Sequence, residues 1–137
     1  NNHLGVPLTL LEIDPQNHDF VIIEAGMNAP GEIEPLSRMI DPTASIITMV
    51  ANTHLEVFDS IESIAHEKAM LGRHTRTDGW VAFNKDCSQY RTFQDFPAIS
   101  VILLPEDATE APIKKNNDYL YWSKSNQHHE MENCYSS

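Results

Sequence analysis

The chain has 137 residues, 41% of them apolar and 21% charged, which is enough for one domain with a sizeable core. Its formal net charge of −11 argues against nucleic-acid binding, which normally shows a basic surface. No apolar run approaches membrane-spanning length, and Cys87 and Cys134 are too few for a disulfide framework, so we predict a cytoplasmic protein with no membrane partner.

The first predicted elements are a short helix over residues 5–13 and a strand over residues 20–23. The helix follows from closely spaced apolar residues and ends before the pair Asp14-Pro15. The strand is an uninterrupted apolar run, which is typical of a strand covered on both faces in a parallel sheet. Glu24 follows at once, at the edge where open α/β sheets bind ligands. A solvated glutamate that opens a loop is the alternative interpretation of this residue.

Strands and helices then alternate along the chain. Apolar residues at helical spacing predict a helix over residues 31–40, and buried strands are predicted over residues 44–50, 80–84 and 98–104. One further strand, over residues 119–122, would lie at an edge. Three helix–strand alternations with short links imply right-handed crossovers and a mainly parallel sheet with flanking helices, an α/β fold.

A third predicted helix, capped by Asp59 or Ser60, carries a lysine on its apolar side. Helical spacing places Lys68 on the apolar face and three polar residues elsewhere. The apolar face consists of Ile61, Ile64, Ala65 and Leu71, and the residues predicted to lie elsewhere are Glu62, His66 and Glu67.

Three polar residues are candidates for chemistry because each follows a strand or lies on that apolar face: Glu24, His54 and Lys68. Carboxylate oxygen and imidazole nitrogen are both metal ligands, and oxygen is the better match to Mg²⁺. Lys68 and His54 also have structural interpretations without a role in chemistry. A lysine often extends past apolar surface to water, and a histidine is often a hydrogen-bonded structural group. No phosphate loop of the form G-x-x-x-x-G-K-[ST] occurs in the sequence.

Several separated motifs over residues 1–87 resemble the ATP-dependent Mur ligases in both order and spacing. After Cys87 the resemblance is weak, and Cys87 itself stands where relatives often have a second aspartate. The motifs are Asn1-Asn2-x-x-Gly5-Val6-Pro7-Leu8-Thr9-Leu10-Leu11, Glu24-x-Gly26-x-Asn28-x-Pro30-Gly31-Glu32-Ile33, Thr53-His54-Leu55-Glu56-x-Phe58-x-Ser60, Ile64-Ala65-x-x-Lys68 and Phe83-Asn84-x-Asp86.

The resemblance implies that residues 1–105 are an incomplete P-loop-type central domain, and that residues 106–137 are a divergent edge segment and polar tail. The phosphate loop would lie upstream of Asn1, and the C-terminal domain of the parent enzyme is also missing. The nearest subgroup joins D-alanyl-D-alanine to UDP-N-acetylmuramoyl-tripeptide in peptidoglycan synthesis, with ATP and Mg²⁺. By itself the 137-residue chain is expected to be inactive.

The resemblance also implies roles for individual residues. Glu24, His54 and Lys68 would hold Mg²⁺, with Lys68 carbamylated as in several members of the family, and Lys68 and His54 would act in catalysis. The residues implied to bind cofactor or substrate are Asn2, Asn28 and Asn84.

Two interpretations from other classes of protein stay open at this point. One is a metal-dependent hydrolase that uses Glu24 and His54 on a self-sufficient domain, although two protein ligands are few for a metal site. The other is a non-catalytic remnant that serves as an interaction module. Retention of Glu24, His54 and Lys68 together argues against such decay.

Overall fold

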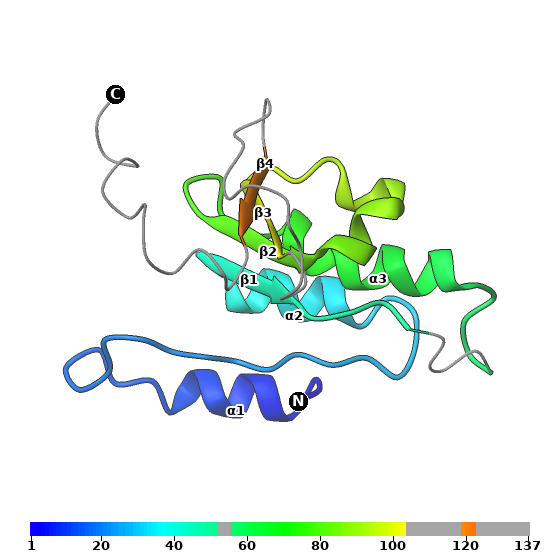
Figure 1. Cartoon of the computed structure of the whole chain (residues 1–137). Coiled ribbons are helices and arrows are strands. Elements are labelled where there is room, and N and C mark those ends of the chain that lie inside the picture. Colours follow the sequence, from blue (N-terminus) through cyan, green and yellow to red (C-terminus); the bar gives the residue numbers. More distant parts are fainter. Residues whose placement is uncertain (52–55, 104–118, 123–137) are drawn as a thin grey trace, which may run out of the picture.

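The computed structural model of the chain describes residues 1–51, 56–103 and 119–122. Four strands form one sheet in chain order, and all three pairings are parallel (Figure 1). This confirms the predicted α/β fold. The elements are α1 (Gly5–Leu11), α2 (Ile33–Ile40), β1 (Ala44–Ile47), α3 (Ile61–Arg73), β2 (Trp80–Asn84), the 3₁₀ helices η1 (Lys85–Gln89) and η2 (Arg91–Phe93), β3 (Ile99–Leu103) and β4 (Tyr119–Trp122).

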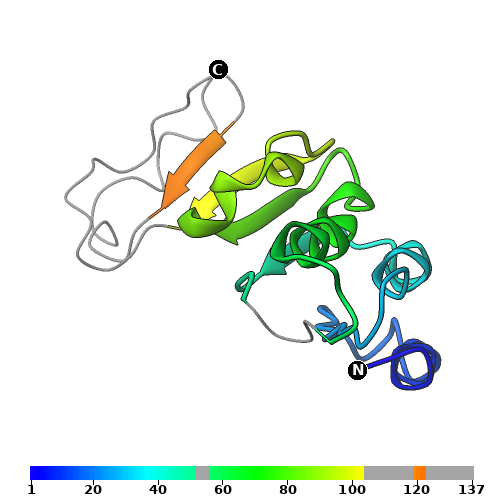
Figure 2. The same ribbon diagram turned by 90° about the vertical axis from the view of Figure 1, so that its right-hand side faces the viewer.

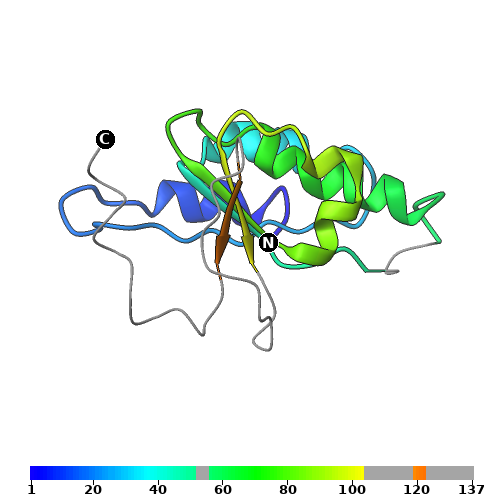
Figure 3. The same cartoon turned by 45° about the horizontal axis from the view of Figure 1, so that its top comes forward.

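The main core lies between the sheet and α3, with η2 beside that helix (Figures 2 and 3). Phe83 of β2 is fully buried, and its ring packs edge-on against Phe93 and Phe96 at centroid distances of 5.2 and 5.8 Å. Apolar side chains from the sheet, α3 and η2 therefore share one core. Its buried members are Ile47, Ala65, Ala69, Val81, Phe83, Cys87, Phe93, Ala98 and Ile102.

The opposite face of the sheet is partly open within the described part of the chain. The expectation of strands buried on both faces holds at the centre of β2, where Val81, Ala82 and Phe83 are all buried, and is corrected for β1 and β3. Ile46, Trp80 and Ile99 lie on this face and are 58%, 41% and 53% exposed. In β1, buried residues alternate with exposed ones, because α3 covers only one side of it. The strand also ends at Ile47, earlier than the predicted range 44–50.

The predicted strand over residues 20–23 is wrong. These residues are assigned to no strand, and Phe20 and Ile22 are 90% and 95% exposed. The segment runs back alongside α1 instead of entering the sheet (Figure 1). Apolar and β-branched residues favour a strand only where a neighbouring strand pairs with them, and among the described residues none pairs with this run.

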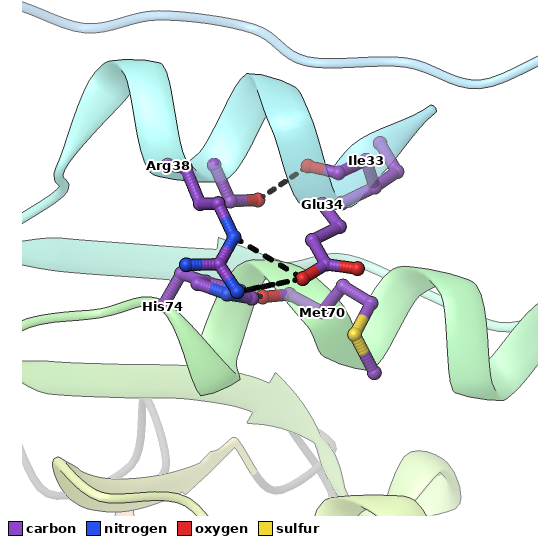
Figure 4. A network of polar contacts seen from close by, with 6 residues as sticks. Ile33, Glu34, Arg38, Met70 and His74 are labelled. Atoms are coloured by element: carbon purple, nitrogen blue, oxygen red, sulfur yellow. Dashed lines mark hydrogen bonds and ion pairs between the residues drawn. The ribbon is translucent and has the colours of Figure 1, made fainter. Parts of the chain in front are cut away.

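Helix α3 lies between two partners, the sheet on one side and α2 on the other (Figure 2). At the end of α2, Arg38 donates a hydrogen bond to Glu34 at 2.8 Å, and His74, which follows α3, approaches the same carboxylate at 3.7 Å (Figure 4). Only 19% of the His74 side chain is exposed. In the described part of the chain, no helix is long and apolar enough to cross a membrane.

Replacing Ser60 with alanine is expected to lower the free energy of unfolding by about 1 kcal/mol. Ser60 is the N-cap of α3, and its Oγ accepts a hydrogen bond from the Ser63 backbone N–H at 3.2 Å. The Ser63 hydroxyl in turn accepts from the Ser60 N–H at 3.1 Å, which completes a capping box. Urea unfolding of Ser60→Ala measures the loss, with Thr77→Ala, which removes an exposed hydroxyl, as the control. Equal stability of the two variants would contradict this role of the cap.

Candidate functional site

A hollow of about 260 Å³ lies where β1 ends, between α3 and the segment that leads into α2. Its walls come from parts of the chain that are far apart in sequence, and most of the lining residues are of apolar types. Of the ten described residues that line it, Lys68 alone carries a charge. The lining residues are Ala25, Gly26, Met27, Ile33, Ile46, Ile47, Thr48, Met49, Lys68 and Leu71.

Lys68 is half-buried on α3, next to the fully buried Ile64 and Ala65, which confirms its predicted place on the apolar face. Its Nζ donates a hydrogen bond to the carbonyl oxygen of Met49 at 2.6 Å. Burial lowers the pKa of Lys68, and the nearby Cys87 sulfur opposes this shift. A cation on an apolar surface needs a polar partner, and here a backbone carbonyl beyond the end of β1 provides it.

Cys87 lies close to Lys68, in η1 directly after β2, and is 1% exposed. Burial raises the pKa of the Cys87 thiol, and hydrogen bonding to the backbone of Val50 offsets part of that shift. A buried thiol with a raised pKa is a poor nucleophile. Cys87 is therefore a small buried side chain beside the site and no candidate for a catalytic thiol.

Glu67, the neighbour of Lys68, is a buried carboxylate that sequence reasoning missed. Its residue is 6% exposed, and its two oxygens accept hydrogen bonds from the N–H groups of Gly31 at 2.9 Å and Ile33 at 2.8 Å. Helical spacing predicted that Glu67 does not lie on the apolar face of α3. This is correct, because the apolar face meets the sheet and Glu67 lies on another side of the helix. Glu67 lies on the side of α3 that meets α2, and this side is buried as well. No pattern in the local sequence indicates that α3 has a second buried side.

A second hollow, of about 300 Å³, shares Gly26 and Met27 with the first and is otherwise lined by Asn1, Asn2 and Asn28. The Gly26 N–H donates to the Asn1 carbonyl at 2.8 Å, which ties the start of the chain to this segment. Asn2 Oδ1 accepts from the N–H groups at the start of α1, so this side chain has a structural contact as well. Two of the three predicted cofactor-binding asparagines thus line one hollow.

The third, Asn84, is exposed at the end of β2, and its Oδ1 accepts from the Asp86 N–H at 3.2 Å at the start of η1. Glu24 is exposed and lines neither hollow, although Gly26 and Met27 nearby line both. His54 lies outside the described residues. Within those residues no group of three or more His, Cys, Asp or Glu side chains could hold a metal ion, so the shared metal site of Glu24, His54 and Lys68 stays a prediction.

Comparison with known proteins connects this arrangement to a family. The sequence model described as "Mur ligase middle domain" matches residues 1–134. This chain belongs to the Mur ligase family. The predicted resemblance, drawn from motifs over residues 1–87, is thereby confirmed. Family membership favours a ligase over a metal-dependent hydrolase, because the members of this family are ATP-dependent ligases.

Curated relatives of this Mur ligase chain carry the name UDP-N-acetylmuramoyl-tripeptide--D-alanyl-D-alanine ligase. The Bacillus subtilis protein is 38% identical over 86 residues, which are 63% of this chain and 19% of the relative. A Buchnera aphidicola protein is 31% identical over 117 residues, which are 85% of this chain and 24% of the relative. The chain therefore spans about a fifth to a quarter of the length of these relatives.

The fold of this Mur ligase chain is similar to that of a solved structure. The crystal structure of MurF from Acinetobacter baumannii superposes with a TM-score of 0.63 and 26% sequence identity, over 74% of this chain and 23% of that one. The parallel α/β arrangement is therefore shared with MurF.

Proposed function

We propose that this chain is part of the central domain of an ATP-dependent amide ligase, which joins D-alanyl-D-alanine to UDP-N-acetylmuramoyl-tripeptide in the cytoplasm. The similarity to relatives that carry this name, over 63% to 85% of the chain, is the observation that carries the proposal. The product would be a precursor of peptidoglycan. The hollow beside Lys68, at the end of a parallel strand, supports it because such strand ends are where α/β sheets bind ligands.

In this chemistry the tripeptide carboxylate attacks the γ-phosphate of ATP, and ADP leaves as an acyl phosphate forms. The amine of the dipeptide then attacks the acyl carbonyl, phosphate leaves, and an amide bond results. Negative charge develops in both steps, so preorganised cationic and polar groups contribute most of the acceleration. The Lys68 side chain, positioned by the bond from its Nζ to the Met49 carbonyl, would serve these steps by holding a metal cation and not as a cation itself.

We propose that Mg²⁺ is held by Glu24, His54 and a carbamylated Lys68. Carboxylate and carbamate oxygens suit this ion, and Lys68 faces the hollow. When bound, Mg²⁺ would neutralise charge on the phosphate oxygens. Asn2 and Asn28 would contact the nucleotide or the peptide substrate from the second hollow, and Asn84 would do so from the end of β2.

The test is a product assay with the protein made from the complete coding sequence. We expect ADP, phosphate and the amide product only when ATP, Mg²⁺, UDP-N-acetylmuramoyl-tripeptide and D-alanyl-D-alanine are all present. Tripeptides that differ in their third residue are assayed in parallel. Phosphate release that needs no dipeptide would point to a hydrolase, and no turnover with any tripeptide would overturn the proposal.

The 137-residue chain by itself is expected neither to hydrolyse ATP nor to ligate. Its sequence contains no phosphate loop, and without one the β- and γ-phosphates lose the backbone amides and the lysine that normally hold them. An ATPase assay on the purified chain, with the complete protein as the positive control, measures this. Mg²⁺-dependent turnover that disappears in the Glu24→Ala variant would show the expectation to be wrong.

A further inference from the structure

We propose that Glu67 is a positioning residue of the ligase, a role that rests on the proposed function. Its carboxylate fastens the segment that leads into α2 to α3, and thereby sets how far that segment lies from Lys68. Neither the family resemblance nor the predicted sites include Glu67.

The contacts of Glu67 join two distant parts of the chain. Oε2 accepts from the Gly31 N–H at 2.9 Å and Oε1 accepts from the Ile33 N–H at 2.8 Å, so both oxygens bind backbone amides. Ile33 is the first residue of α2, and Gly31 has a φ of +84°, in the region that favours glycine. A negative charge at this end of a helix also compensates the positive end of the helix dipole.

The clamped segment forms one wall of the candidate site. Ala25, Gly26, Met27 and Ile33 line the hollow beside Lys68, and Gly26 and Met27 continue into the hollow with Asn28. A second carboxylate secures the same turn locally, because Glu32 Oε2 accepts from the Asn28 N–H at 2.7 Å. Glu67 adds hydrogen bonds between the turn and α3 to the apolar packing of Met27 and Ile33 against Ile64 of α3. The next residue along α3 is Lys68 itself.

This geometry predicts a specific kinetic effect. The clamp sets the width of the hollow, so releasing it displaces one wall relative to the other, and a displacement of about 1 Å can cost about a hundredfold in rate. A group that only stabilises the fold would instead change the melting temperature and leave kcat of the folded enzyme unchanged. The two roles are therefore separable in properly folded variants.

The experiment compares Glu67→Gln with Glu62→Gln in the complete protein, well below the melting temperature of each. Glutamine keeps the size of the side chain but offers one acceptor oxygen, and its NH₂ group then faces an N–H donor. Glu62 is an exposed carboxylate in the first turn of the same helix and serves as the matched control. Glu67→Asp is the second variant, because it keeps both acceptors and the charge while drawing them back by one methylene.

Two readouts are needed, hydrogen exchange and steady-state kinetics. We expect faster exchange at the amides of Gly31 and Ile33 in Glu67→Gln, together with a loss of at least about tenfold in kcat. KM for each substrate should change by less than about threefold, and Glu62→Gln should stay within about twofold of wild type throughout. Glu67→Asp should fall between wild type and Glu67→Gln in both readouts.

Either of two results would overturn the inference. Unchanged exchange at Gly31 and Ile33 would show that Glu67 does not hold the turn. Faster exchange with kcat within about threefold of wild type would show a structural clamp without a positioning role. Failure of the wild-type protein to ligate overturns the proposed function instead, and the exchange arm distinguishes that case because it needs no activity.

Discussion

Replacing Lys68 with alanine in the complete protein is expected to lower the rate of ligation at least about a hundredfold, the scale seen when one preorganised electrostatic group is lost. Lys68 is the charged side chain of the 260 Å³ hollow, and its Nζ lies 2.6 Å from the Met49 carbonyl oxygen. An ammonium next to Mg²⁺ would be repelled, whereas a carbamate reverses the charge and supports the ion. Single-turnover formation of the amide product measures the loss.

Two further variants decide what Lys68 contributes. Lys68→Arg keeps a cation and hydrogen-bond donors for the Met49 carbonyl but cannot be carbamylated, so we expect it to lose activity as well. Arg73→Ala removes an exposed cation from the last turn of the same helix and should have little effect. Added bicarbonate should raise wild-type activity if carbamylation is incomplete, and short carboxylic acids should partly rescue Lys68→Ala.

A purely structural role of Lys68 predicts a different result. A lysine that only extends past apolar surface to bond a backbone carbonyl could be removed with a rate within about threefold of wild type. That result would remove Lys68 from the proposed active site. Activity retained by Lys68→Arg but lost by Lys68→Ala would assign it a cationic role and exclude the carbamate.

Replacing Phe83 with alanine is expected to lower the free energy of unfolding by about 3–5 kcal/mol. The side chain is fully buried in the core between the sheet and α3, and it packs edge-on against Phe93 and Phe96. Those two rings also contact each other, at a centroid distance of 5.6 Å. Truncation therefore removes apolar burial and two aromatic contacts and leaves a cavity that the neighbouring rings fill only in part.

Urea unfolding of the purified protein measures this loss. Ile46→Ala is the control, because Ile46 lies on the open face of the same sheet and is 58% exposed, so its truncation should cost no more than about 1 kcal/mol. Phe83→Leu keeps most of the volume and should fall between the two. Equal destabilisation by Phe83→Ala and Ile46→Ala would mean that the core does not lie between the sheet and α3.

The elements with strong local signals were predictable from the chain alone. The strand over residues 80–84 was predicted with the bounds that β2 has, and Ser60 was one of two predicted caps for α3. Helical spacing also placed Lys68 on the apolar face that the structure shows. These features depend on side-chain periodicity and capping within one element, which are properties of a short stretch of sequence.

The strand expected over residues 20–23 failed for a different reason. The apolar run of Phe20 and its neighbours has the composition of a buried strand, but a strand exists only when another strand pairs with its backbone. In the structure this segment lies beside α1, and Ile22 is 95% exposed. Glu24 was expected at the end of that strand, so its predicted place at the sheet edge lost its support with the strand.

The sequence by itself determined the parallel α/β class, the family and the face of α3 on which Lys68 lies. Only the tertiary structure decided that Glu67 is buried, that its carboxylate accepts hydrogen bonds at the start of α2, and that residues 25–27 line the same hollow as Lys68. The periodicity of a helix reports which residues share a face, but not how many of its faces are covered. Whether a face is covered depends on contacts between residues that are distant in sequence, such as Glu67 with Gly31 and Ile33.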